Sequence, residues 1–547
     1  MLFTAVTFIG FTALVAVVAW WMTRGDDLST QDGYFLAGRK LTGPVIAGSL
    51  MLTNLSTEQL IGQTGQSFAT NMGPIAWEVT SCVALIMLAL IFLPKYLKMG
   101  LTTVPEFLEN RYDTTTKRII SFMFLLGYLL TYLPTVLYSG ALVFNQIFEI
   151  DQRLGVSQLQ GVVVTAVAIG IVGACYAIFG GLKAVAVSDT INGVGLIIGG
   201  FMIPIFGLLI LGNDNIIHGI NDLITTVPAF KFNAVNPADA VAPMIPWPVL
   251  FTGMVVNNLF YWCTNQSIIQ RTFGAKNLKE AQKGAIFASF LKLVGPFFIT
   301  ICGIIAFRMS MDPNEGFFTA AQIENLTRTT DLAYPTLVLT VLPKPLLGFF
   351  AAVLFGAILS SFNSALNSSV TLYTLDIHRP MFNPGATDAH LVRVGKRFGV
   401  ILAAVSIIVA PFVSLAPSGL YDFLQSCFGF FNVPILAAVI VGLFNKHVPA
   451  VAPKVSLVMH VVLYSVSKLI PGLQNIHYLY VLAVLFALNV IVMLLIGKFN
   501  PRPEAYVMRD AGAVDLTPWK YAKPVACVSI CLMLCVYFLF SPLGLAG

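Results

Sequence analysis

The sequence predicts an all-α, polytopic membrane protein with about fourteen transmembrane helices. Of its 547 residues, 57% are hydrophobic and only 10% are charged, and the mean hydropathy is +0.83. An ordinary soluble domain carries about 25% charged residues. Apolar runs of roughly 20 residues, the length that a bilayer requires, recur along the chain. The formal net charge of +6 therefore indicates membrane topology rather than nucleic-acid binding, because the basic residues lie between these runs.

The apolar runs set the order of the predicted helices. They lie at 3–23, 44–66, 72–97, 119–148, 158–178, 184–212, 247–268, 284–307, 345–374, 394–416, 419–443, 449–470, 476–497 and 522–543. If the helices alternate in direction, the loops on one side carry 24 lysine and arginine residues and those on the other carry six. The basic side is predicted to be cytoplasmic, which places both termini outside. The first run lacks a basic segment and a cleavage motif, so we expect a retained helix rather than a signal peptide.

The run at 44–66 is interrupted at its centre by the polar sequence TNLSTEQ. Polar side chains at this depth are costly unless they face a cavity enclosed by protein. Transporters use discontinuous helices of this kind, whose free carbonyl groups coordinate ions. The alternative is that these side chains only bond neighbouring helices. The carboxylate of Glu58 favours a functional role, since ionisable groups inside membranes are usually functional.

A stripe of amide and aromatic residues follows the run at 247–268. Asn258, Tyr261, Trp262 and Asn265 recur at helical spacing. An aromatic ring beside amides can stack on a polar organic solute and hydrogen-bond to it. An ordinary seam between helices is the alternative.

The run at 345–374 carries a third polar face. Its hydroxyl and amide residues, which follow Ala357 at intervals of three or four, are Ser360, Ser361, Ser364, Asn367 and Ser368. A hard cation prefers oxygen ligands. Carbonyl groups of the interrupted helix opposite these hydroxyls therefore predict a weak sodium site, and weak binding suits an ion that must also leave.

Three further charged residues lie within the apolar runs: Glu78, Lys292 and Asp189. A lone lysine near the bilayer centre costs at least about 2.5 kcal/mol. We therefore expect Lys292 to be compensated by Glu58, by Glu78 or by a bound solute. Asp189 follows a serine near a helix start, so helix capping is an equally good explanation for that carboxylate.

Other chemistry is not indicated by the sequence. No histidine or cysteine cluster has metal-ligand spacing, no phosphate-binding glycine loop occurs, and no nucleophile-base set is apparent. We expect a protein that is not an enzyme, has no cofactor and binds no metal other than sodium. Its expected partners are a small-molecule solute, Na⁺ and the lipid bilayer, without nucleic acid.

Six motifs in order carry a resemblance to a known family. They are DGYFLAGRKL (32–41), LMLTNLSTEQLIG (50–62), TVPEFLENRY (103–112), YAIFGGLKAVAVSD (176–189), FYWCTNQSIIQRTFGAKNLKEAQKG (260–284) and ILSSFNSALNS (358–368). The chain resembles the solute:sodium symporters, within them the bacterial sodium/sugar branch, which is similar to animal sodium/glucose cotransporters.

The resemblance implies a LeuT-like core built from an inverted five-plus-five repeat, in a bacterial inner membrane. The expected parts are a first peripheral helix and loop (1–43), one repeat half (44–212), an outside loop (213–246), the second half (247–443) and three additional helices (444–547).

The resemblance also implies site residues. The sodium ligands would be the carbonyl groups of Leu52, Leu55 and Ala357 and the hydroxyls of Ser360 and Ser361, with Asp189 on the exit route of the ion. The sugar contacts would be Gln59, Glu78, Ser81, Asn258, Lys292 and Gln425, with Tyr261 as a stacking gate. Two positions depart from the family pattern: Trp77 replaces a gate residue that is often tyrosine, and Tyr132 stands where a sugar-binding asparagine would fall.

The expected function is therefore sodium-coupled import of a neutral, galactose- or glucose-like sugar by alternating access. The alternatives are a sodium symporter for a polyol, sialic acid or an amino acid, and a nutrient sensor that does not transport. The sequence leaves the sugar, the sodium-to-solute ratio and the oligomeric state open.

Overall fold

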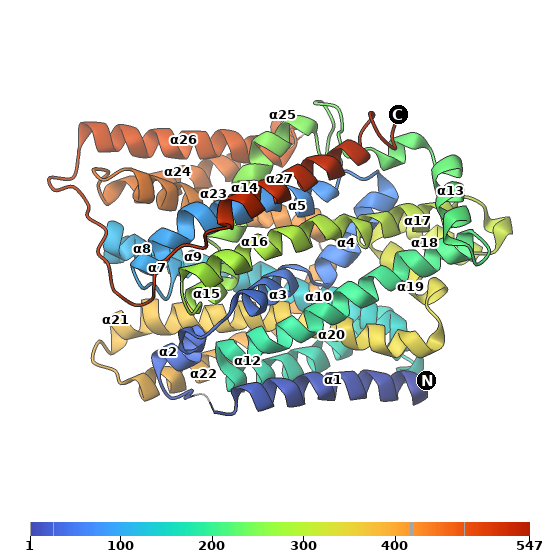
Figure 1. Ribbon diagram of the computed structural model, residues 1–547, viewed down its shortest axis with the longest axis horizontal. Coiled ribbons are helices and arrows are strands. Elements are labelled where there is room, and N and C mark those ends of the chain that lie inside the picture. Colours follow the sequence, from blue (N-terminus) through green and yellow to red (C-terminus); the bar gives the residue numbers. More distant parts are fainter. Residues whose placement is uncertain (1, 26, 416–419, 475) are drawn as a thin grey trace.

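The structure, a computed structural model, describes residues 2–25, 27–415, 420–474 and 476–547. Every regular element in these ranges is a helix. The axes of the long helices lie roughly parallel to one another, and both termini lie at the same end of the molecule (Figure 1). The predicted all-α class is confirmed.

The helices follow the predicted order. The first part of the chain forms α1 (Leu2–Thr23), α2 (Gln31–Leu36), α3 (Gly43–Asn54), α4 (Thr57–Ala69), α5 (Ile75–Val79), α6 (Ser81–Met87), α7 (Leu93–Lys98), α8 (Val104–Arg111), α9 (Thr114–Gly127), α10 (Leu133–Phe148), α11 (Ile150–Leu154) and α12 (Gln158–Leu211). The middle part forms α13 (Ile216–Thr226), α14 (Gly253–Cys263), α15 (Gln266–Phe273), α16 (Leu278–Val294), α17 (Thr300–Ser310), α18 (Ala320–Arg328), α19 (Ala333–Val341), α20 (Lys344–Thr371), α21 (Arg379–Phe382) and α22 (Asp388–Val409). The last part forms α23 (Leu420–Phe444), α24 (Val451–Leu469), α25 (Pro471–Gln474), α26 (Tyr478–Phe499) and α27 (Ala522–Leu539).

Eleven helices of the described residues are long and apolar enough to cross a membrane. Three predicted runs are not among them. The runs at 44–66 and 247–268 are each divided into shorter helices, and the third, α24, has a lower mean hydropathy because it contains two lysines and a histidine. The predicted ends at 416 and 419 lie outside the described residues.

Two helices are broken near their centres. Between α3 and α4, Leu55 and Ser56 adopt extended backbone conformations, which leaves carbonyl groups of α3 without helical partners. Between α14 and α15 the Asn265 side chain accepts a hydrogen bond from the Ser267 N–H and caps the new helix. The first break was predicted and the second was not. A broken helix thus opens each predicted half, as the inverted-repeat fold requires; the boundaries of the halves themselves stay predictions.

Prolines widen three of the long helices into π-helical turns. These turns are η2 (Leu88–Phe92), η3 (Tyr128–Tyr132) and η9 (Leu372–His378), and they precede Pro94, Pro134 and Pro380 by two residues. Proline has no N–H to donate and its ring crowds the preceding turn, so the helix gains a residue there. Pro134 thereby sets the position of Tyr132, a residue that lines the cavity described below.

Gly181 makes the sharp turn inside α12. Its backbone angles, φ 62° and ψ −177°, are accessible almost only to glycine. The expected loop at 179–183 is therefore a turn at one residue. Asp189 lies eight residues farther along the helix, so the helix-capping explanation for its carboxylate is wrong.

The loop at 213–246 packs over the end of α4. It begins with the short helix α13. In the 3₁₀ turn η4 (Ala229–Phe232), the buried Lys231 donates from Nζ to the carbonyl oxygen of Phe68 at 2.6 Å. The same Nζ lies 3.8 Å from the ring centroid of Phe307. A cation at the carboxyl end of a helix stabilises its dipole, so Lys231 anchors α4.

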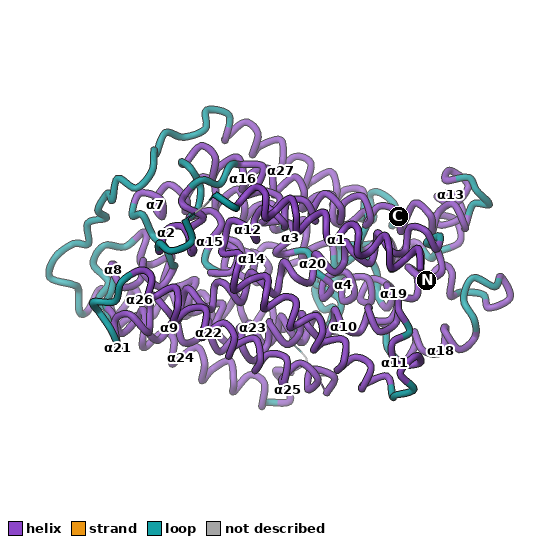
Figure 2. Tube along the Cα trace, turned by 90° about the horizontal axis from the view of Figure 1, so that it is seen from below, coloured by secondary structure: helices purple, strands orange, loops and turns teal. Residues whose placement is uncertain are grey.

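The polar segment between α26 and α27 forms a strap across the opposite end of the molecule (Figure 2). Ala511 donates its N–H to the carbonyl of Lys98, and Leu278 donates to the carbonyl of Asp515. The strap therefore joins the end of α7 to the start of α16.

Candidate functional site

The break between α3 and α4 faces the serine-rich side of α20. Ser361 donates from Oγ to the carbonyl oxygen of Thr53 at 3.0 Å, and the hydroxyls of Thr53 and Ser364 are 3.2 Å apart. The structure thus brings the hydroxyl of Ser361 to the backbone segment that holds Leu52 and Leu55, and all of these residues are buried. The arrangement places carbonyl and hydroxyl oxygens together, as a sodium site needs.

Asp189 lies on the other side of this oxygen-rich region. Its carboxylate accepts from Ser49 Oγ at 2.7 Å, and from Arg271 Nη2 and Thr53 Oγ1 at 3.5 Å each. Arg271 also donates from Nε to Ser49 Oγ at 2.6 Å and from Nη2 to Ser364. Arg271 therefore connects α15 with α3, α12 and α20.

Arg271 is a site residue that the sequence reading missed. The segment at 269–283 was expected to be a cytoplasmic loop, but it begins inside α15, where Arg271 has no exposed surface. A single arginine next to the polar end of an apolar run carries no sequence signal that separates a buried residue from a loop residue.

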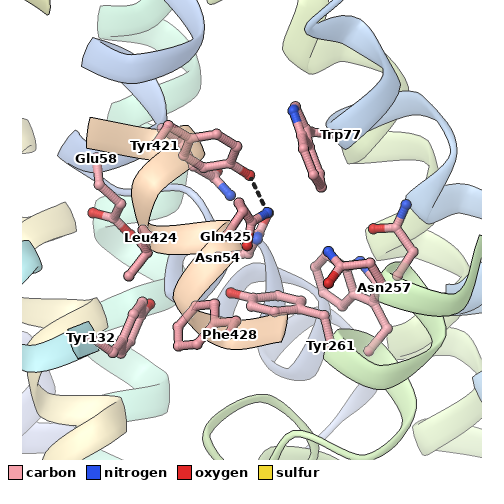
Figure 3. A pocket seen from close by; sticks show the side chains of 13 residues that line it. Asn54, Glu58, Trp77, Tyr132, Asn257, Tyr261, Tyr421, Leu424, Gln425 and Phe428 are labelled. Carbon is pink, nitrogen blue, oxygen red and sulfur yellow. Dashed lines mark hydrogen bonds between the residues drawn. The ribbon is translucent and has the colours of Figure 1, made fainter. Parts of the chain in front are cut away.

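A small cavity lies between the two broken helices and α23 (Figure 3). Its lining consists of Asn54, Glu58, Gln59, Trp77, Tyr132, Asn257, Asn258, Tyr261, Trp262, Tyr421, Leu424, Gln425 and Phe428. Of the predicted sugar contacts, Gln59, Asn258, Tyr261 and Gln425 line it. The cavity measures about 30 Å³, which is room for one or two water molecules. Typical small-molecule pockets enclose roughly 300–1,000 Å³, so solute entry requires the surrounding helices to separate.

The other predicted sugar contacts lie behind the cavity wall. Lys292 forms a buried ion pair with Glu78 and also donates to the side chain of Asn54, which lines the cavity. Glu78 accepts a second hydrogen bond from Gln63 Nε2 at 2.8 Å, and Ser81 Oγ donates to the Glu78 carbonyl at 2.5 Å. Glu78, one of the two carboxylates expected to compensate Lys292, thus forms the ion pair with it.

Aromatic rings close the cavity. The rings of Trp77 and Tyr421 meet edge to face, with centroids 5.5 Å apart, and those of Tyr132 and Phe428 lie 5.9 Å apart. The hydroxyl of Tyr132 donates to the Thr53 carbonyl at 3.4 Å, the same oxygen that Ser361 contacts. Tyr132 therefore forms a wall between the cavity and the predicted sodium site.

The contribution of α23 was largely missed, because only Gln425 was expected from that helix. Tyr421, Leu424, Gln425 and Phe428 follow one another at spacings of three, one and three residues. This is the pattern of one helix face, and it could have identified the stripe.

Among the described residues, no group of three or more histidine, cysteine, aspartate or glutamate side chains is placed to hold a metal ion. The oxygen groups near Thr53 are of the kind that suits an alkali cation.

A comparison with solved structures identifies the fold. The solved structure of a Na⁺-coupled sialic acid symporter, in a substrate-bound outward-open state, aligns with a TM-score of 0.75 and 19% sequence identity. The alignment covers 91% of this chain and 98% of that one. This similarity shows the fold alone, a LeuT-like transporter fold.

Sequence relatives identify the family. The Uncharacterized symporter YidK of Escherichia coli (strain K12) is 46% identical over 534 residues, covering 97% of this chain and 90% of that protein. A sodium/glucose cotransporter of Vibrio parahaemolyticus is 33% identical over 447 residues, covering 80% and 79%. Residues 34–451 match the profile described as Sodium:solute symporter family. The chain belongs to the sodium:solute symporter family of membrane transport proteins.

Proposed function

We propose that this protein imports a neutral, galactose- or glucose-like sugar together with sodium across the bacterial inner membrane by alternating access. The observation that carries the proposal is the meeting of Ser361 and the Thr53 carbonyl beside a cavity of amide and aromatic side chains. The sodium/glucose cotransporter among the relatives supports a sugar as the solute.

Sodium would bind where α3, α4 and α20 meet. We assign the carbonyl groups of Leu52, Leu55 and Ala357 and the hydroxyls of Ser360 and Ser361 as its ligands. Asp189, whose carboxylate lies next to the Thr53 hydroxyl, would receive the ion as it leaves. Neutral oxygens bind an alkali ion weakly enough for release.

The sugar would occupy the cavity after it widens. Gln59, Asn258 and Gln425 offer amide groups to hydroxyls, and Tyr261 offers an aromatic face to the apolar side of a sugar ring. Glu78, Lys292 and Ser81 would act from behind the wall, because Lys292 bonds both Glu78 and Asn54, and Ser81 bonds the Glu78 carbonyl.

The energy for accumulation would come from sodium entry. One Na⁺ moving inward contributes about 2.3 kcal/mol per 100 mV of membrane potential, in addition to its concentration gradient. That amount alone supports more than tenfold accumulation of a solute. Under this proposal the protein needs no organic cofactor and catalyses no covalent reaction.

Uptake into proteoliposomes tests the proposal. The purified protein is reconstituted, an inward sodium gradient is imposed, and uptake of D-galactose, D-glucose, myo-inositol, sialic acid and proline is compared with uptake in potassium. Sodium-stimulated uptake of a neutral sugar is the expected result. If sodium stimulates uptake of sialic acid or proline alone, the proposed solute is wrong. If uptake does not depend on sodium, sodium is not the coupling ion.

A further inference from the structure

The charges buried around the cavity do not cancel. Among the described side chains there, Lys292 pairs with Glu78, and Arg271 pairs with Asp189. Glu58 remains, 3% exposed, without a basic partner. The formal charges of these groups therefore sum to one negative charge, and a low-dielectric interior penalises the ionised form of Glu58 strongly as long as no cation is near it.

Glu58 has features that make it available to a ligand. It lies in the first turn of α4, where the positive end of the helix dipole favours a carboxylate. Its Oε2 is buried and receives no hydrogen bond from the described residues. Its side chain belongs to the cavity lining, beside Leu424 (Figure 3).

The other free polar atoms of the lining are few. Oε1 of Gln59 is also buried without a partner, whereas the amide groups of Asn258 and Gln425 already donate to Thr80 and Tyr421. Trp77 Nε1 is an unpartnered donor. A ligand that satisfies these groups must donate to two acceptors and accept from one donor; a hydroxyl-bearing solute does both.

We propose that Glu58 is the counter-charge of the coupling ion and the hydrogen-bond acceptor for the solute, so that the cavity takes a neutral, hydroxyl-rich molecule with one Na⁺ and rejects solutes that carry a carboxylate. One Na⁺ would stabilise the ionised form of Glu58 and bring the net charge of the site to zero, and a neutral solute preserves that balance. A carboxylate solute would restore an uncompensated negative charge next to Glu58. This inference rests on the proposed sodium-coupled function.

Sodium binding without any solute gives the first test. Trp77 and Trp262 line the cavity, so tryptophan fluorescence in detergent reports sodium titrations. We expect Glu58→Gln to weaken sodium binding by roughly tenfold or more, Glu58→Asp to retain it within about threefold because the charge persists, and Glu324→Gln, a surface control on α18, to leave it unchanged. Equal sodium affinity in wild type and Glu58→Gln would overturn the role of Glu58.

Solute competition gives the second test. Uptake of labelled D-galactose or D-glucose is competed with the same hexose and with its uronate, which differs only by a carboxylate at C6. In the wild type we expect the hexose to compete at least about tenfold better, and Glu58→Gln to reduce this preference. A uronate that competes as well as the hexose would overturn the inference while sodium-driven sugar uptake stands. Absence of sodium-driven uptake of any sugar would instead refute the proposed function, and the fluorescence titration would still decide the role of Glu58.

Discussion

At the scale of single residues, Ser361 is the most direct link between α20 and the break in α3–α4. Ser361→Ala removes the hydroxyl that reaches the Thr53 carbonyl. We expect the sodium concentration for half-maximal uptake to rise by about tenfold, the effect of losing one buried polar interaction. Sodium-activation curves in proteoliposomes measure it. Ser369→Ala is the control, because the Ser369 hydroxyl bonds only the Ala365 carbonyl within its own helix. An unchanged curve for Ser361→Ala would exclude that hydroxyl from the ion site.

The pair of Lys292 and Glu78 is a second residue-scale feature. Lys292→Met leaves a buried carboxylate unpaired, which costs about 3–5 kcal/mol. We expect a clear fall in the thermal unfolding midpoint in detergent. The double variant Lys292→Met/Glu78→Gln should recover most of the midpoint, because no unpaired charge remains, but it should not recover sugar affinity. A double variant as unstable as the single one would show that lost packing, not charge, sets the cost.

At the scale of helices, α4 and α23 touch through a glycine. A methyl group on Gly62 would lie 2.4 Å from Cβ of Tyr421, so Gly62→Ala prevents the close approach of these helices. We expect the two helices to sit farther apart and sugar uptake to slow several-fold. Spin-label distances between the ends of α4 and α23 measure the separation. Gly385→Ala, where the new methyl meets nothing within 4 Å, serves as the control. An unchanged distance distribution would contradict the packing described for this contact.

The burial of Lys231 predicts a pH dependence of stability. Burial lowers the pKa of Lys231 from 10.5 to about 8. Between about pH 8 and 10.5 the unfolded chain holds a proton on this lysine that the folded protein has released. The contribution of this group to the free energy of unfolding therefore rises with pH across that window, by up to about 1.4 kcal/mol per pH unit.

The measurement is the difference in thermal unfolding midpoint between wild type and Lys231→Met at pH 7.5, 8.5 and 9.5. Other titrating groups cancel in that difference. We expect the thermal unfolding midpoint of the wild type to rise relative to that of Lys231→Met as the pH rises. A difference that is constant with pH would show that Lys231 keeps an ordinary pKa in the folded protein.

At the scale of the whole molecule, both termini lie at one end, which predicts that they lie on the same side of the membrane (Figure 1). From the excess of basic residues in the loops at the other end, we expect both termini to lie outside the cytoplasm. Alkaline phosphatase fused after Gly547 should be active and green fluorescent protein at the same place should be dark. Both reporters inserted at 384–386 should behave in the opposite way. Reversed activities would invert the proposed orientation.

The sequence predicted the class, the order of helices and the first broken helix, because polar residues at mid-membrane depth leave a strong signal. The second break was not predicted, because Asn265 fits a continuous polar stripe on one helix as well as it fits the cap at the start of a new helix. Arg271 and Tyr421 were missed for another reason. Their roles arise from contacts between segments far apart in the chain, Asp189 in one case and Trp77 in the other. Periodicity places Tyr421 on the same face of α23 as Gln425, but it does not reveal which helices meet there, because such contacts depend on the packing of whole helices.

The size of the cavity has a consequence for the cell's water balance. A transporter that enclosed a large water-filled cavity would move water across the membrane in every transport cycle, with or without a bound solute. Here the space between the broken helices holds at most a couple of water molecules. Transport cycles without a bound solute would therefore move almost no water. Measurable swelling of vesicles should accompany only the cycles that carry a solute.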